Sequence, residues 1–106
     1  MQTKTGQPGG GVLMEPCKAT VGDTVRLKAE FRNFEGELVE VMFPELNIYD
    51  ASRKKLDSFE PTEEKEGKYY HDYTIPNIPG PIYFEFKGEL DGKPIVGRSV
   101  IDKEWV

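Results

Sequence analysis

The sequence predicts an all-β protein, an antiparallel β-sandwich of about seven strands. The first observation is two stretches dense in aromatic and β-branched residues, 67–75 and 82–90. The second is the cluster of Pro and Gly residues between them, at 76–80. The third is the Asp91-Gly92 pair, which supplies the positive φ angles of a two-residue hairpin turn. No segment has the length and periodicity of an ordinary helix.

The length of 106 residues suits one hydrophobic core and is too short for two ordinary ones. We therefore expect residues 12–106 to form a single domain. Residues 1–11 end in three glycines and show no periodicity, which predicts a flexible Gly-rich N-terminal arm.

The formal net charge of −5, from 19 acidic and 14 basic residues, argues against nucleic acid or an anionic membrane as a partner. The one cysteine, Cys17, cannot form an intramolecular disulfide. The N-terminus has no apolar stretch that could serve as the core of a signal peptide. These features predict a cytoplasmic protein, or one assembled inside the cell.

The first half of the chain predicts three or four strands. Residues 12–18 are expected to form one edge strand, where Pro16 is tolerated because it needs no ladder partner. After a turn at 21–23, apolar and charged residues alternate over 25–32, which predicts a half-buried strand whose inward side chains are Val25, Leu27, Ala29 and Phe31.

The middle of the chain is less regular. A turn at 33–37 precedes residues 38–43, which fit either a short strand or a loop that crosses the sandwich, and Pro44 is expected to end this segment. The next strand, 45–50, turns Leu46 and Ile48 inward, with Phe43 as a further inward candidate. After a turn and a strand at 54–59, we expect the acidic run 60–66 to be a solvated loop.

The next two strands follow from alternation, and the last strand alternates more weakly. From Gly67, the inward set is Tyr69, His71, Tyr73 and Ile75, and in the following strand it is Ile82, Phe84 and Phe86. The same alternation turns Tyr70, Tyr83, Glu85 and Lys87 outward. Residues 94–106 are expected to form the final strand, which closes the sheet.

No residue set in the sequence assembles a catalytic or metal site. His71 is the only histidine, and its place in mid-strand predicts a packed structural residue rather than a general base. One Cys and one His far apart do not supply the four ligands of structural zinc. The carboxylates of 60–66 lack the spacing of a calcium loop. We therefore expect no enzymatic activity, no metal and no cofactor.

Three aromatic residues are the candidates for binding a partner. Tyr70 and Tyr83 are predicted to face outward, where they could stack on sugar rings or anchor a protein interface. The simpler interpretation, which we favour, is that they form a cross-strand pair that stabilises the sheet. Trp105 lies next to the C-terminus, where it either closes the end of the core or docks onto a partner.

The segments 21–31, 46–50, 67–76 and 79–94 together resemble immunoglobulin-like sandwich domains. More narrowly, they resemble small immunoglobulin-like proteins encoded in the structural gene clusters of bacteriophages and prophages. The resemblance covers about residues 20–106. It rests on moderately specific motifs, a Gly-x-Tyr before a strand and an Asp-Gly in the final hairpin.

The resemblance implies a non-catalytic virion component, such as a head-decoration, head–tail or tail accessory protein. Such a protein is assembled in the host cytoplasm and binds a larger capsid or tail protein lattice, or copies of itself. The Gly-rich arm suits this function because a disordered terminus can become ordered against a neighbouring subunit. The alternative is a glycan- or surface-binding module of a bacterial protein that uses Tyr70, Tyr83 and Trp105.

Overall fold

The computed structural model of the protein describes residues 11–104, which form nine β-strands and no helix. The strands are β1 (Gly11–Leu13), β2 (Cys17–Thr20), β3 (Thr24–Arg32), β4 (Met42–Tyr49), β5 (Lys55–Phe59), β6 (Thr62–Lys65), β7 (Lys68–Thr74), β8 (Ile82–Leu90) and β9 (Lys93–Glu104). The expected number of about seven was too low, because one predicted strand is divided in two and one predicted loop is a strand.

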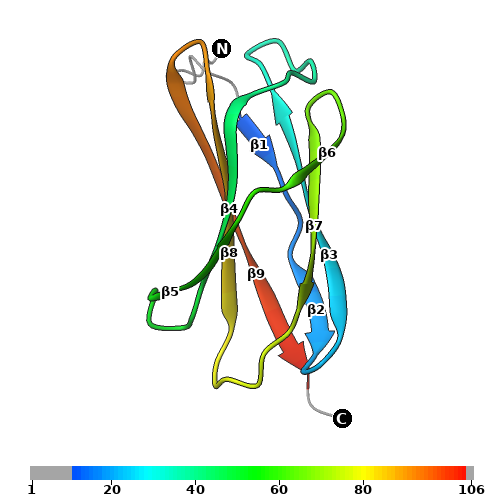
Figure 1. The fold of residues 1–106 in the computed structure, drawn as a ribbon, viewed down its shortest axis with the longest axis vertical. Helices are drawn as coiled ribbons and strands as arrows, with labels where there is room; N and C mark the ends of the chain where they lie inside the picture. The colour runs from blue at the N-terminus through cyan, green and yellow to red at the C-terminus, as the bar shows by residue number, and fades with distance from the viewer. Residues whose placement is uncertain (1–10, 105–106) are drawn as a thin grey trace, which may run out of the picture.

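The strands form two sheets, which face each other across the core (Figure 1). The four-stranded sheet has the order β1-β3-β7-β6, and the five-stranded sheet has the order β2-β9-β8-β4-β5. The predicted all-β sandwich is confirmed. All strand pairs are antiparallel except β2 with β9, which is parallel and makes the five-stranded sheet mixed.

Most of the core consists of inward side chains that alternation predicted, but it also contains Ala19, Val41, Ile95 and Ile101, which were not predicted. Leu27 and Phe31 of β3 are buried, as are Leu46 and Ile48 of β4, and the largest fully buried side chains are Phe31, Phe84 and Phe86. The ring of Phe31 meets that of Tyr69 edge-on, with centroids 5.3 Å apart. Burial of each such side chain contributes about 1.5–3 kcal/mol, so these few positions supply much of the driving force for folding.

The predicted edge strand at 12–18 is wrong, because the chain changes sheets within it. β1 pairs with β3 in the four-stranded sheet, and β2 pairs with β9 in the five-stranded sheet. Pro16 lies between the two strands. Because proline has no N–H for a ladder, it is suited to the point where the chain leaves one sheet and enters the other.

The expectation that Pro44 ends a segment is also wrong, since Pro44 lies inside β4. The ladder of β4 with β8 shifts register between Met42 and Glu45, which places Pro44 at a β-bulge. Phe43 has a φ of 55° and is 69% exposed, so it is not an inward residue. Of the two alternatives for this segment, a short strand or a crossing loop, residues 38–41 form the loop. Within it, Leu38 makes one isolated β-bridge to Arg32.

Two further predictions concern turns and loops. The acidic run 60–66 contains the short edge strand β6, which pairs with β7, so a loop was wrong there, but all four residues of β6 are exposed. The two-residue hairpin is confirmed: Leu90 pairs with Lys93, and Asp91 and Gly92 have φ angles of 54° and 76°. The predicted flexible arm at 1–11 lies outside the described residues except for Gly11, which begins β1.

Candidate functional site

Tyr70 and Tyr83, the two outward tyrosines, lie on different sheets. Tyr70 belongs to β7 and Tyr83 to β8, so their side chains emerge from opposite outer faces of the sandwich. The interpretation of these residues as a cross-strand pair is therefore wrong, as is their assignment to one shared surface. The reason is that alternation orients a side chain relative to its own strand and does not identify the sheet. Trp105 lies outside the described residues.

The ring of Tyr70 is already covered on one side. The guanidinium of Arg26, from the neighbouring strand β3, lies 4.0 Å from the ring centroid. Two hydrogen bonds to Asp72, of 2.8 and 3.1 Å, hold Arg26 in this place. The hydrogen bond from Arg26 lowers the pKa of Asp72, and its counterpart raises the pKa of Arg26. Tyr70, Arg26 and Asp72 therefore satisfy one another.

Tyr83 has a different cross-strand partner, Tyr49 of β4. The guanidinium of Arg53 lies 5.6 Å from the ring centroid of Tyr83. Arg53 sits in the turn between β4 and β5 with a φ of 69°, a left-handed conformation that favours glycine. The carboxylate of Asp50 accepts hydrogen bonds from the backbone N–H groups of Ser52 and Lys54, each 2.9 Å long, and so fixes the turn.

A buried carboxylate lies beside the two tyrosines. Glu85 faces outward, as predicted, yet it is only 6% exposed because neighbouring side chains cover it. It accepts hydrogen bonds from Asn47 Nδ2 at 3.0 Å and from the hydroxyl of Tyr49 at 3.2 Å, and an ion pair joins it to Arg98 at 2.9 Å. The pKa of Tyr49 is raised, mainly by burial and then by the charge of Glu85. The side chain of Arg98 remains 71% exposed.

These groups surround an open hollow of about 800 Å³ on the outer face of the five-stranded sheet. We call it the tyrosine–arginine hollow, and its lining residues are Pro16, Tyr49, Arg53, Tyr83, Glu85, Arg98, Ser99 and Val100. Its volume lies within the range of about 300–1,000 Å³ that is usual for ligand sites. Two guanidinium groups and one carboxylate give it a net positive charge. Sequence reasoning found Tyr83 but missed Tyr49 and both arginines, although the alternation of Tyr49 with Ile48 indicates its outward direction.

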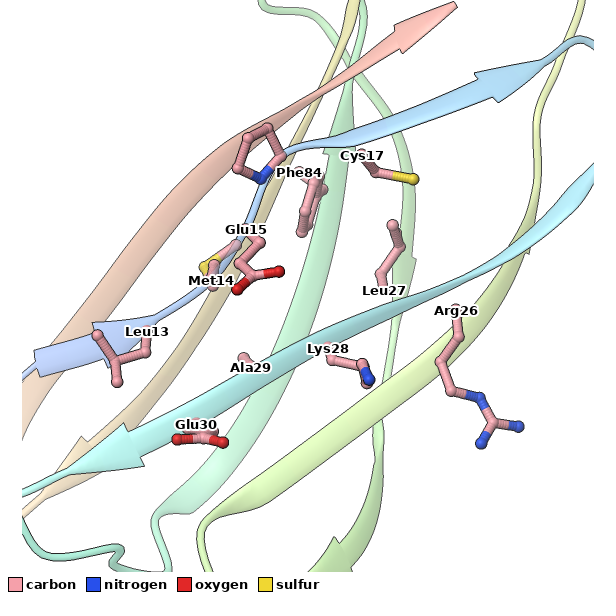
Figure 2. Close-up of a pocket in the computed structure, with 11 residues that line it drawn as sticks. Leu13, Met14, Glu15, Cys17, Arg26, Leu27, Lys28, Ala29, Glu30 and Phe84 are labelled. Atoms are coloured by element: carbon pink, nitrogen blue, oxygen red, sulfur yellow. The ribbon is translucent and has the colours of Figure 1, made fainter.

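A second hollow, of about 530 Å³, lies at the edge of the sandwich between residues 13–17 and β3 (Figure 2). We call it the edge slot. Leu27 and Phe84 project into the gap between these two chain segments, and the side chain of Glu15 points into it from the opposite wall (Figure 2). The slot exists because the chain stops pairing with β3 after Leu13 and begins to pair with β9 at Cys17.

The backbone of β3 lines this slot with groups that no strand among the described residues pairs. In an antiparallel strand, the N–H and C=O of alternate residues point to the same side. The N–H of Phe31 donates to Gly67, so the odd-numbered residues of β3 point toward β7. The N–H and C=O of Arg26 and Lys28 therefore point toward the slot, where no strand within residues 11–104 pairs with them.

His71 and Cys17 have local structural partners. The ring of His71 stacks on Phe59, with centroids 4.1 Å apart and an interplanar angle of 20°, and it is half-buried rather than fully in the core. Burial raises the pKa of the Cys17 thiol, which disfavours the nucleophilic thiolate.

Within residues 11–104, no group of three or more His, Cys, Asp or Glu side chains could hold a metal ion. The described part of the chain contains no helix able to cross a membrane.

A comparison of the chain with models of known protein families gives no match, and a comparison with curated proteins gives none either. The resemblance to phage immunoglobulin-like proteins stays a prediction.

Proposed function

We propose that the protein is a non-catalytic interaction module, and specifically a virion-associated protein that docks onto a capsid or tail protein lattice. The open edge of β3 beside the edge slot carries this proposal. An exposed sheet edge can add an extended strand of a partner, in which backbone hydrogen bonds supply affinity and pockets for alternate side chains supply specificity. The virion assignment rests on the resemblance of residues 20–106 to phage structural proteins.

The edge slot has the backbone element of such a docking site. Arg26 and Lys28 offer backbone donors and acceptors along one wall. Leu27 and Phe84 lie at the base of the slot and are almost fully buried, so an added strand would pack over them rather than insert a side chain between them (Figure 2). Lys28 is exposed and makes no ion pair among the described residues. An acidic outward residue on the added strand would therefore face an available cation.

The chemistry of the titratable groups supports a function without catalysis. The ring of His71 packs against Phe59. The hydrogen bond of the Cys17 thiol is to the carbonyl of Lys18, at 3.8 Å. Nucleophilic catalysis needs a nucleophile and a base within hydrogen-bond reach of each other. His71 and Cys17 instead contact Phe59 and the carbonyl of Lys18.

The test uses virus particles purified from cells that encode the protein. Mass spectrometry should detect the wild-type protein in the particles. Lys28→Pro removes an N–H that β7 does not use, so the variant should fold and be lost from the particles. Lys28→Ala keeps that N–H and removes only the side-chain cation, so it should be retained more fully than Lys28→Pro. Absence of the wild-type protein from particles contradicts the virion assignment, and retention of folded Lys28→Pro contradicts docking at the edge of β3.

A glycan-binding function is the second candidate, and the cross-strand pair of Tyr49 and Tyr83 favours it. Tyrosine rings on an outer sheet face present apolar surface with a polar edge, which suits sugar rings. On a glycan array, the wild-type protein should then bind and a Tyr83→Ala variant should not. An array without binding contradicts this function.

A further inference from the structure

We propose that the tyrosine–arginine hollow binds an acidic segment of a partner protein through Arg53 and Arg98. This inference rests on the proposed interaction function, but it concerns a surface on the five-stranded sheet, whereas the edge slot lies along β3 of the four-stranded sheet. The two surfaces can therefore fail independently in experiments.

Charge complementarity identifies the ligand as anionic. The chain as a whole has a formal charge of −5, yet the hollow contains two guanidinium groups and one carboxylate. That carboxylate, Glu85, is buried and already engaged by Asn47, Tyr49 and Arg98. Arg53 is exposed and makes no ion pair among residues 11–104. The hollow is therefore locally positive although the protein as a whole is acidic. An incoming carboxylate would meet the positive charge of Arg53 there.

Arg98 is held in position before a ligand arrives, and the backbone of Arg53 is fixed by its turn. The ion pair of Arg98 with Glu85 uses Nη2, while the side chain as a whole stays 71% exposed, so part of the guanidinium is free to bind. The turn closed by Asp50 places Arg53 beside the ring of Tyr83. Preorganisation of this kind reduces the entropy that binding would otherwise cost.

The aromatic residues favour a protein segment as the source of the carboxylate. Tyrosine and arginine are among the residue types enriched at the positions that dominate the energy of protein–protein interfaces, which lie in desolvated pockets. Here Tyr49 and Tyr83 lie side by side in the ladder, and Val100 pairs with Tyr83 on its other side. This row presents apolar surface for the aliphatic part of an acidic segment, while the arginines receive its carboxylates.

The inference is tested by titrating the full chain, labelled with ¹⁵N, with an end-blocked octaglutamate peptide and observing amide chemical shifts. We expect shifts concentrated at Tyr83, Ser99 and Val100, and binding that weakens at least fivefold between 50 and 300 mM salt, which is about the loss for release of one or two counterions. An end-blocked octaglutamine peptide should cause no shifts there. Arg53→Gln should weaken binding of octaglutamate at least fivefold.

The matched control is Arg26→Gln, which removes the other arginine that lies against a tyrosine, on the opposite outer face. It should leave the affinity within twofold of wild type. Arg98→Gln should weaken binding at least fivefold. Arg98→Gln leaves buried Glu85 without its cation and could unfold the protein. In that case Arg98→Lys, which keeps the cation, and Arg53→Gln decide the test.

Three results would overturn the inference. The first is the absence of shifts with octaglutamate, or equal shifts with octaglutamine. The second is an equal loss of affinity in Arg26→Gln and Arg53→Gln, which would indicate attraction to the whole surface rather than binding in the hollow. The third is tighter binding of a galacturonate oligosaccharide than of octaglutamate at the same residues, which would assign the hollow to an acidic glycan. In each case, strand addition at the edge slot keeps its own test.

Discussion

The two outer faces of the sandwich carry the same pair of side chains, a tyrosine with an arginine beside its ring. On the four-stranded sheet, Arg26 lies 4.0 Å from the ring centroid of Tyr70 and is held by two hydrogen bonds to Asp72. On the five-stranded sheet, Arg53 lies 5.6 Å from the ring centroid of Tyr83 and has no carboxylate partner among the described residues. A neighbouring aspartate thus distinguishes an arginine that already has an anionic partner, Arg26, from one that can receive an anion, Arg53.

The faces also differ in how their acidic groups are placed. Asp72 is exposed, and its pair with Arg26 competes with water and salt. Glu85 is covered by its neighbours and receives three polar contacts. The first arrangement adds little to folding, whereas the second fixes the positions of side chains in the tyrosine–arginine hollow. The comparison leads to three predictions.

The largest effect is expected from Glu85→Ala on the five-stranded sheet. The change leaves Asn47 Nδ2 without its acceptor in a buried place and removes the charge that orients Arg98. The free energy of unfolding should fall by about 2 kcal/mol, measured by urea denaturation. Asp72→Ala on the opposite face is the control and should cause a clearly smaller loss. Equal losses would contradict the distinction between a buried and an exposed network.

A smaller effect of opposite sign is expected from Arg53→Gly. The φ of 69° costs less for glycine, so the free energy of unfolding should rise by about 1 kcal/mol. The same variant should lose its affinity for octaglutamate, because the guanidinium is gone. If Arg53→Gly is more stable than wild type and binds octaglutamate more weakly, the turn tolerates backbone strain in order to position a binding residue. A variant that is less stable than wild type would argue against strain at Arg53.

The smallest effect concerns the pH dependence of the four-stranded sheet. The pKa of Asp72 is lower in the folded protein than in the unfolded chain, mainly through its hydrogen bond with Arg26. Its contribution is therefore fully present above the unfolded pKa of about 3.9 and is lost as pH falls through the lower folded pKa. Asp72→Asn should be less stable than wild type at pH 6.5, and the difference should be smaller at pH 2.5. Urea midpoints at both pH values measure this, and a constant difference would contradict it.

Alternation made the core predictable, and it fails at identifiable points. Leu27, Phe31 and Phe84 are inward in both the prediction and the structure, because a period of two places every second side chain on one face. Phe43 was a candidate for the core and is exposed, because the bulge beside Pro44 interrupts that period. Local patterning does not reveal where a bulge will fall, since it depends on the fit between β4 and β8.

The candidate sites were predictable only in part. Tyr83 and its outward direction followed from the pattern of β8, but its neighbours did not. Tyr49, Arg53 and Arg98 come from three separate parts of the chain, and their meeting depends on the pairing of β8 with both β4 and β9. The edge slot was missed for the same reason, because it is the gap left where the chain passes from one sheet to the other.

By itself, the sequence determined the all-β class, the hairpin at Asp91-Gly92 and the division of most strands into an inward and an outward face. These are local properties, set by side-chain alternation and by the φ angles that particular residues prefer. Only the tertiary structure decided that β7 and β8 belong to different sheets, which separates Tyr70 from Tyr83. Sheet membership arises from pairing between residues distant in the chain. The same pairing leaves β3 open at one edge and brings two arginines to one tyrosine pair.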